Sequence, residues 1–238
     1  MVGLGPGGKL DRTHRAEKAI AESQVVSGYT KYLEQITDLT ASKELISSGM
    51  TQEIERCKRA LDRAIAGATV SLVSSGDAGI YGMAGLALEL AEQSGASIDI
   101  EIVPGVSAAN AAAARLGAPL MLDFACISLS DLLVPWPEIR QRLEAVAKAD
   151  LVVALYNPRS KKRVNQLEEA AEILRASRPG STPVGIATAV GHEDEKIVMS
   201  TLRQFLACEI GMRSIVIVGN RSSKMLSRWF VTPRGYEV

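Results

Sequence analysis

Short apolar runs alternate with longer amphipathic stretches along most of this chain. Residues 70–73 form an apolar run of the kind that favours a β-strand. The stretch before it carries apolar residues at intervals of three or four with charged residues between them, namely Ile54, Cys57, Leu61 and Ile65. This spacing predicts a helix with one buried stripe, and Gly67 is placed to end it.

A second strand and a second helix are predicted further along the first half of the chain. Residues 98–103 alternate between apolar and polar positions as far as Pro104 and Gly105, which indicates a strand followed by a turn. The alanine-rich stretch 107–116 then predicts a helix that Gly117 closes. Because residues 117–119 have the composition of a hinge, we expect one domain over residues 1–118 and another over residues 119–238.

The same alternation starts again beyond residue 119. Strands are predicted over 125–129, 151–156, 183–187, 196–200, 214–218 and 229–231, and helices over 137–148 and 165–176. Strands that alternate with helices are typical of a layered α/β architecture. We therefore expect an α/β fold built from two α/β domains.

Composition and charge exclude some classes of protein. The chain has 238 residues, of which 47% are hydrophobic and 23% are charged, so it can bury a substantial core. Lys and Arg together number 27, as do Asp and Glu together, so the formal net charge is zero. Proteins that hold nucleic acid through its phosphates usually carry a basic excess. We therefore expect no nucleic-acid partner.

The cysteines and histidines do not suggest a metal centre. They are Cys57, Cys126, Cys208, His14 and His192, and no CxxC pair is among them. This pattern favours reduced thiols in the cytoplasm and predicts neither a disulfide framework nor a bound metal. The most apolar stretch, residues 106–136, is interrupted by charged residues, so we expect no membrane span.

Residues 3–8 form a glycine-rich loop with Pro6 inside it. Glycines there permit positive φ angles and let a ligand approach the main chain, although a tight turn without a ligand would use the same residues. The loop is not a dinucleotide fingerprint, because GxGxxG needs a full strand before it and only Met1 and Val2 precede Gly3. We therefore expect the start of this sequence to trim the first strand.

A second glycine-rich loop, residues 74–83, directly follows the strand predicted over 70–73. Ligands bind at the carboxyl ends of strands in open α/β sheets, so Asp77 could hold a hydroxyl or a cationic group there. The alternative is that Asp77 caps the following helix. A third loop precedes the helix predicted over 107–116. From this loop alone, we interpret Ser107 as the N-cap of that helix.

Four basic residues lie between the strand predicted over 151–156 and the next helix, namely Arg159, Lys161, Lys162 and Arg163. Cations at a helix N-terminus oppose the macrodipole by about 0.3–1 kcal/mol each, so the cluster is either a solvated turn or a site for an anion.

The sequence has no nucleophile elbow, P-loop or HExxH motif. Such loops suit a reaction in which a cofactor brings the reactive group.

These loops, in this order, resemble those of the tetrapyrrole methylase family. The general signals are Gly-Pro-Gly at residues 5–7 and Gly-Asp at residues 76–77. The more specific signals are ISLSDLLVPW at residues 127–136 and YNPRSKKR at residues 156–163, which resemble the subgroup that methylates C-17 of corrin precursors. Further similar segments lie at residues 28–32, 50–53, 103–108, 191–196 and 219–220, so the resemblance covers nearly the whole chain.

The resemblance implies S-adenosylmethionine as the cofactor, bound in a cleft between two α/β domains, and a cytoplasmic homodimer without a membrane partner. The cofactor contacts that it implies are Pro6, Gly76, Asp77, Ala78, Ile80, Ser107, Ala108, Tyr156, Asn157, Thr188 and Ala189. It also gives the basic cluster a role, because the carboxylates of a tetrapyrrole substrate would bind Arg159, Lys161, Lys162 and Arg163.

The implied reaction is methylation at C-17 of a precorrin-3-type tetrapyrrole with ring contraction, which gives (cobalt-)precorrin-4 in cobalamin biosynthesis. Ring contraction needs a proton acceptor, for which His14, Tyr29, Tyr81 and Asp77 are candidates. Three alternatives remain: a methylase of the same fold that acts on RNA or a protein side chain, a nicotinamide-dependent oxidoreductase, and a non-catalytic ligand-binding protein.

Overall fold

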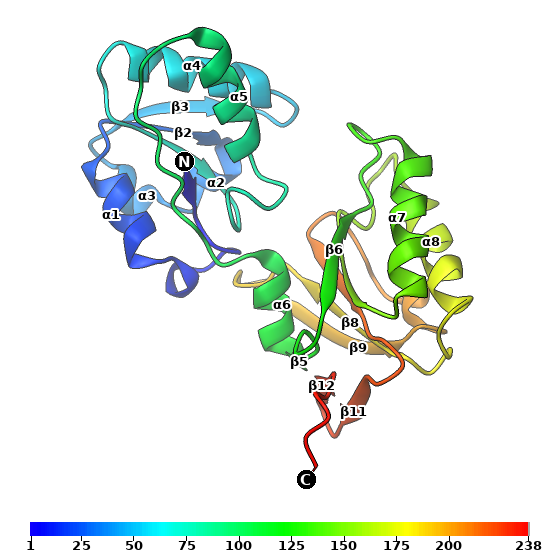
Figure 1. Ribbon diagram of the computed structural model, residues 1–238. Helices are drawn as coiled ribbons and strands as arrows, with labels where there is room; N and C mark the ends of the chain where they lie inside the picture. Colours follow the sequence, from blue (N-terminus) through cyan, green and yellow to red (C-terminus); the bar gives the residue numbers. More distant parts are fainter. Residues whose placement is uncertain (238) are drawn as a thin grey trace. The chain divides into compact units, whose positions relative to one another are not determined.

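The computed structural model describes residues 1–237 and divides into two compact units, Met1–Ala108 and Ala109–Val238 (Figure 1). The division falls after the first residue of helix α6 (Ala108–Leu116), whereas the hinge-like composition of residues 117–119 placed the domain boundary after the end of that helix. Packing explains why α6 groups with the second unit. Leu116 is fully buried, and a Cβ atom on Gly185 would lie 2.5 Å from its side chain.

The first unit contains a four-stranded parallel sheet in the order β1-β4-β2-β3. The strands are β1 (Val2–Gly3), β2 (Val25–Tyr29), β3 (Glu44–Ser48) and β4 (Val70–Ser74). The helices are α1 (His14–Glu22), α2 (Thr30–Glu34), α3 (Thr37–Thr40), α4 (Glu53–Ile65) and α5 (Ala84–Ser94), with a 3₁₀ turn at Lys9–Asp11. Helices α4 and α5 cover one face of the sheet and α1 covers the other (Figure 1).

Helix α4 confirms the helix predicted before β4, but its buried face differs from the predicted stripe. Cys57 is fully buried, whereas Ile54 is 57% exposed and Ile65 is 48% exposed. The residues of α4 that are buried are Arg56, Cys57 and Ala60. Gly67 follows the end of the helix with a φ of 92°, a conformation that glycine adopts without a steric cost.

The strand predicted over residues 98–103 is not present among residues 1–237. Of these residues only Val103 makes a bridge, a parallel one to Val2. The rest of the segment is extended chain beside the end of the sheet. Beyond the Val103 bridge, the carbonyl of Glu101 accepts from the nitrogen of Met1 over 2.7 Å.

The second unit contains a mixed five-stranded sheet in the order β6-β7-β10-β8-β9. The strands are β6 (Phe124–Ser128), β7 (Val152–Tyr156), β8 (Pro183–Thr188), β9 (Lys196–Thr201) and β10 (Ser214–Val218). Only the β6–β7 pair is parallel within this sheet as described. Since β10 runs antiparallel to both β7 and β8, these two strands run in the same direction and their carboxyl ends share one edge.

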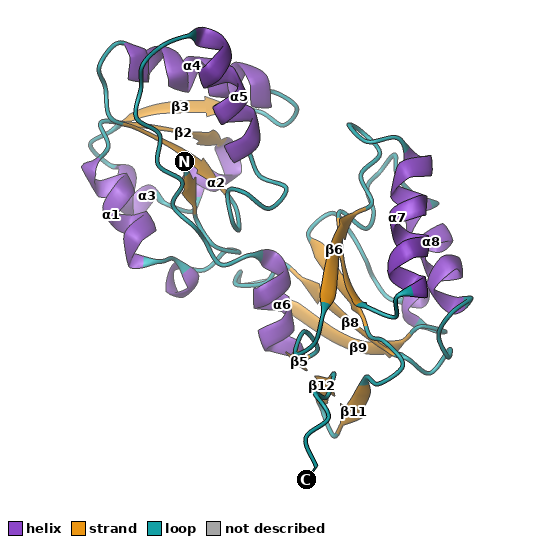
Figure 2. Cartoon of the chain, in the orientation of Figure 1, coloured by secondary structure: helices purple, strands orange, loops and turns teal. Residues whose placement is uncertain are grey.

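Two helices, α7 (Trp136–Lys148) and α8 (Gln166–Arg175), lie side by side on one face of that sheet (Figures 1 and 2). Their inward residues, including Leu143, Leu167 and Leu174, are fully buried.

A small sheet joins β11 (Lys224–Leu226), β12 (Trp229–Val231) and β5 (Gly117–Ala118). The strands and helices predicted beyond residue 119 are confirmed, with ends that differ by at most one residue. No helix within residues 1–237 is long and apolar enough to cross a membrane.

Candidate functional site

Three loops of the first unit are joined through their main chains at the carboxyl ends of β1 and β4. The N–H of Gly5 donates to the carbonyl of Gly76 over 3.1 Å, and the N–H of Gly76 donates back to the carbonyl of Gly5 over 2.7 Å. The N–H of Leu4 donates to the carbonyl of Ser74 over 2.8 Å. The Pro6 loop is therefore fixed against the loop that follows β4, although β1 has only two residues.

Gly105 brings the third loop against the other two. A Cβ atom on Gly105 would lie 2.2 Å from the carbonyl oxygen of Gly76 and 2.7 Å from the carbonyl carbon of Gly3. Real Cβ contacts are never so short, and all of the atoms met are main-chain atoms that cannot rotate away. Glycine at this position therefore allows three segments far apart in the sequence to meet.

Asp77 links the same loops with its carboxylate. Its Oδ1 accepts from the N–H of Gly79 over 2.8 Å, and its Oδ2 accepts from the N–H of Gly105 over 3.0 Å. The suggestion that Asp77 caps the next helix is wrong, because α5 begins only after Met83. Asp77 instead holds the loop after β4 to the loop before α6.

All seven expected first-unit cofactor residues lie on these loops. Pro6, Gly76, Ala78 and Ser107 are buried there, and Asp77 and Ala108 are partly exposed. The position of a Cβ on Gly76 would be 3.7 Å from the N–H nitrogen of Ala108, so the second and third loops are in contact. Ile80, the seventh residue, lies in the same loop as Gly76 with a side chain that is largely exposed.

The expected residues of the second unit lie at the shared carboxyl edge of β7 and β8. The hydroxyl of Tyr156 accepts from the N–H of Ala109 over 3.0 Å, at the start of α6. Asn157 has a φ of 50°, an uncommon value for a residue other than glycine, and its Nδ2 donates to the hydroxyl of Ser128 over 2.9 Å. Tyr156 and Asn157 thus tie the end of β7 to α6 and to β6.

Thr188 and Ala189 follow the same pattern at the end of β8. The hydroxyls of Thr188 and Ser214 are 2.7 Å apart, and the N–H of Ala189 donates to the carbonyl of Arg213 over 2.9 Å. Ala189 is buried with a φ of 53°. A strained main-chain conformation persists only where the surrounding contacts hold it in place, and such conformations are common at ligand sites.

The basic cluster divides into two pairs with different surroundings. Arg159 forms an ion pair with Glu168, and the Nε of Arg163 donates to the carbonyl of Asn157 over 2.9 Å. Burial lowers the pKa of Arg163 from its ordinary value, and the nearby Asp131 carboxylate opposes that change. Lys161 and Lys162 are exposed. The arginines therefore hold the loop, and the lysines are the cations that face solvent.

A neighbouring loop, residues 129–135, follows β6; it lies within the ISLSDLLVPW segment that carried the family resemblance, but the sequence analysis assigned it no binding role. Nη1 of Arg163 donates to the hydroxyl of Ser130 over 3.3 Å, so this loop and the basic loop are tied together. Leu132 is 76% exposed and Leu133 is 92% exposed at its tip. The signal in the sequence was a pair of leucines between Asp131 and Pro135, outside any predicted helix or strand.

Residues 1–237 place no group of three or more His, Cys, Asp or Glu side chains where it could hold a metal ion. Both units instead offer main-chain groups, small side chains and hydroxyls at strand ends. These features define an α/β protein whose strand-end loops suit a small organic ligand.

Comparison with known proteins identifies the family. The model of the tetrapyrrole (corrin/porphyrin) methylases matches residues 1–206, and the chain belongs to that family. It is therefore an S-adenosylmethionine-dependent methyltransferase, not the nicotinamide-dependent oxidoreductase considered from the sequence.

Similar proteins cover the whole chain. The probable cobalt-factor III C(17)-methyltransferase of Salmonella typhimurium is 44% identical over 236 residues, which are 99% of this chain and 98% of that protein. The cobalt-factor III methyltransferase of Priestia megaterium is 45% identical over 241 residues, but the chain spans only 45% of its length. The crystal structure of the methyltransferase CobJ superposes with a TM-score of 0.91 at 36% identity and covers 98% of both chains.

Proposed function

We propose that this protein transfers a methyl group from S-adenosylmethionine to C-17 of cobalt-factor III or a closely related precorrin-3-type tetrapyrrole, with contraction of the macrocycle. The observation that carries the proposal is the match to the Salmonella protein, whose name gives methylation at C-17 of cobalt-factor III and whose length agrees with that of this chain. The hydrogen-bonded loops at the strand ends of both units support it, because they provide the main-chain contacts that a small cofactor needs.

The first-unit loops fit S-adenosylmethionine. Their lining is small, at Gly76, Ala78 and Ala108, so the main chain is open to the hydroxyl, amino and carboxylate groups of such a ligand. When bound, the cofactor supplies an electrophilic sulfonium methyl group. Asp77 and Gly105 position the loops that would hold it, and Tyr156, Asn157, Thr188 and Ala189 of the second unit contribute further contacts in this proposal.

The substrate contacts are proposed to lie on the two tied loops of the second unit. Lys161 and Lys162 face solvent and would attract the carboxylates of the tetrapyrrole. The exposed Leu132 and Leu133 would contact its apolar macrocycle. Arg159 and Arg163 would act mainly as positioning residues, since both already bind protein groups.

The reaction is tested by mass spectrometry of the products formed without oxygen. The enzyme is incubated with S-adenosylmethionine and either cobalt-factor III or metal-free precorrin-3B. We expect one added methyl group on the cobalt compound. If neither compound gains a methyl group although the cofactor binds, the acceptor is a different molecule and the proposal is wrong.

The substrate loop is tested by replacing both lysines. We expect Lys161→Gln with Lys162→Gln to raise the KM for the tetrapyrrole about tenfold and to leave kcat within about twofold, because two charge contacts of about 0.7 kcal/mol each are lost at an exposed site. Lys148→Gln, at the exposed end of α7, is the matched control. An unchanged KM in the double variant would remove these lysines from the substrate site.

The same family likeness supports a homodimer in the cytoplasm. Light scattering tests the first part, since a dimer has twice the mass of the 25.4 kDa chain. A mass equal to that of one chain at micromolar concentration would overturn it.

A further inference from the structure

The loop between β8 and β9, residues 189–195, turns sharply at the residues proposed to contact the cofactor. Ala189 has a φ of 53° and Gly191 a φ of 79°, so two of three successive residues are left-handed. Alanine is strained in this conformation and keeps it only where neighbouring contacts hold it. Ala189 and Val190 are buried within the second unit. The shape of the loop therefore depends on the contacts that fix it.

Main-chain hydrogen bonds supply part of this support. The N–H of Ala189 donates to the carbonyl of Arg213 over 2.9 Å, and the N–H of His192 donates to the carbonyl of Ala189 over 3.0 Å. The N–H of Gly191 lies between them in the chain and donates to a side chain, Oε2 of Glu195, over 2.7 Å. An acidic side chain thus closes the turn that follows Ala189.

Glu195 is itself fixed to a second element. Nε of Arg115, in the last turn of α6, donates to the two carboxylate oxygens of Glu195 over 3.0 and 3.3 Å. The Glu195 side chain is 24% exposed, and hydrogen bonds between charged groups are shorter and stronger than neutral ones. The residue after Arg115, Leu116, is fully buried against Gly185 of β8. The carboxylate therefore connects the turn to a firmly packed end of α6.

The neighbouring acidic residue, Asp194, has different surroundings. It forms a bidentate ion pair with Arg213, in which both N–O distances are 2.8 Å. The Asp194 side chain is 63% exposed and that of Arg213 is 55% exposed, and such pairs contribute little because water and salt screen them. Two adjacent residues of the same charge thus differ in what they hold: Glu195 binds the main chain of the turn, and Asp194 binds an exposed guanidinium.

We propose that Glu195 is a positioning residue for the cofactor. Its carboxylate, which Arg115 holds in place, fixes the turn that follows Ala189. Thr188 and Ala189 then keep the geometry in which they contact S-adenosylmethionine. Glu195 does not touch the cofactor and acts through the main chain of residues 189–191. This inference rests on the proposed function, in which Thr188 and Ala189 belong to the cofactor site.

The first unit contains a carboxylate with the same kind of contacts. Asp77 accepts from the N–H groups of Gly79 and Gly105 and so joins two of the cofactor loops. In both units a carboxylate thus binds main-chain amides of the loops at strand ends. A carboxylate suits this role because it accepts several hydrogen bonds at once and makes each of them stronger than a neutral oxygen does.

Substitutions at the two acidic positions test the role of Glu195. We expect Glu195→Ala to raise the Kd for S-adenosylhomocysteine about tenfold, measured by titration calorimetry. Glu195→Gln should raise it about threefold, because its amide oxygen still accepts from Gly191 but has no charge for Arg115. Asp194→Ala and Asp194→Asn are the matched controls, and their Kd should stay within about 1.5-fold of that of the original protein. The KM for the tetrapyrrole should not change in any of the four variants.

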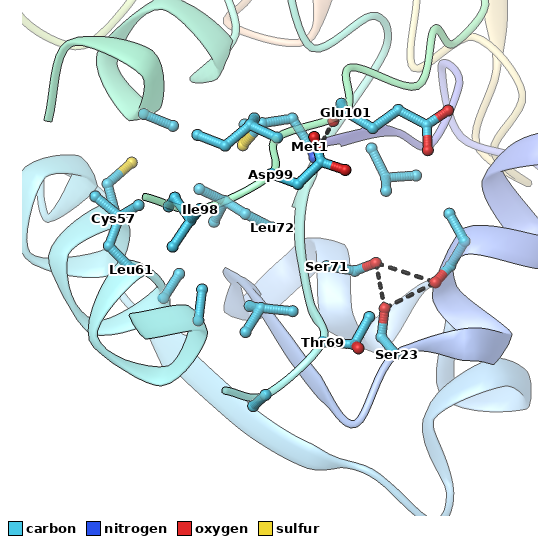
Figure 3. A pocket seen from close by; sticks show the side chains of 18 of the residues that line it. Met1, Ser23, Cys57, Leu61, Thr69, Ser71, Leu72, Ile98, Asp99 and Glu101 are labelled. Atoms are coloured by element: carbon cyan, nitrogen blue, oxygen red, sulfur yellow. Dashed lines mark hydrogen bonds between the residues drawn. The ribbon is translucent and has the colours of Figure 1, made fainter. Parts of the chain in front are cut away.

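Two further measurements separate positioning from a general loss of stability. In the protein without ligand, the Gly191 amide should exchange hydrogen at least about tenfold faster in Glu195→Ala than in Asp194→Ala. Ser71→Ala removes a buried hydroxyl that lies 2.6 Å from the hydroxyl of Ser23, near the amino end of β4 (Figure 3). This variant should lower Tm but leave the Kd unchanged, because the cofactor loop follows the carboxyl end of that strand.

The proposal is overturned if Glu195→Ala binds S-adenosylhomocysteine as tightly as the original protein, or if Asp194→Ala or Ser71→Ala raises the Kd as much as Glu195→Ala does. If Glu195→Ala does not fold, Glu195→Gln is compared with Asp194→Asn, and equal Kd values in that pair overturn the proposal. A protein that binds S-adenosylhomocysteine but methylates neither tetrapyrrole contradicts the proposed function alone, because the Kd values are measured without turnover.

Discussion

Substitution of Gly105 by alanine tests whether the three first-unit loops act as one packed unit. The new Cβ would lie 2.2 Å from the Gly76 carbonyl oxygen, against an ordinary contact of 3.4 Å or more, so at least one loop must move by more than 1 Å. Overpacking of this kind costs about 1–3 kcal/mol. Movement of either loop also lengthens the 3.0 Å bond from the Gly105 N–H to Asp77.

If that strain acts on the loops that bind the cofactor, the Kd for S-adenosylhomocysteine rises about five- to hundredfold. Titration calorimetry measures this change, and urea denaturation measures the loss of stability. Gly85→Ala is the control, because no atom lies within 4 Å of a Cβ at Gly85 and its place in α5 favours alanine by at most about 1 kcal/mol. The reasoning is refuted if Gly105→Ala binds S-adenosylhomocysteine within twofold of the original protein and unfolds at the same urea concentration.

Three further predictions concern single side chains. Tyr156→Phe leaves the N–H of Ala109 without its acceptor, so we expect the free energy of unfolding in urea to fall by about 1–2 kcal/mol. We also expect weaker binding of the cofactor; an unchanged Kd would show that Tyr156 does not contribute to the cofactor site. Arg178→Met removes a buried guanidinium that donates to the carbonyls of Leu151 and Gly219, so we expect a loss of about 3 kcal/mol by the same assay, and a loss below about 1 kcal/mol would contradict this. The guanidinium of Arg12 holds the pKa of Asp38 down at about 2, so this carboxylate adds stability above pH 4 that is lost as the pH falls toward 2. Because the Asp38 side chain is 36% exposed, we expect Asp38→Asn to cost less than about 1 kcal/mol at pH 7 and a smaller amount at pH 2, where about half of the Asp38 carboxyls are protonated, in thermal scans at both values.

The sequence predicted that the loops of the candidate site lie at strand ends, but it did not predict which protein groups their residues contact. The loops around Gly76, Tyr156 and Thr188 all lie at strand ends, as expected. The sequence could not show that Asp77 accepts from Gly105, because the two are 28 positions apart and nothing local pairs them. It also could not separate Arg163, which binds Asn157 within its own loop, from the exposed Lys161.

The first half of the chain was harder to predict than the second. Strands β2 and β3 and helices α1, α2, α3 and α5 were not found, in part because several are short and their apolar residues are interrupted by serine, threonine or glycine. Helix α4 was found from its spacing, yet Ile54 and Ile65 are exposed. A spacing of three or four fixes which residues share a face, but the neighbours in space decide which of them is covered.

By itself, the sequence determined the alternation of strands and helices, the glycine-rich loops at strand ends and the membership of a methylase family. These depend on residues close together in the chain, whose periodicity and turn chemistry are local properties. Only the tertiary structure decided that residues 98–102 form no strand, that Gly3, Gly76 and Gly105 meet, and that two of four basic residues are engaged by protein groups. Each of these outcomes depends on a partner distant in sequence or on whether a side chain is covered, and no local pattern records either.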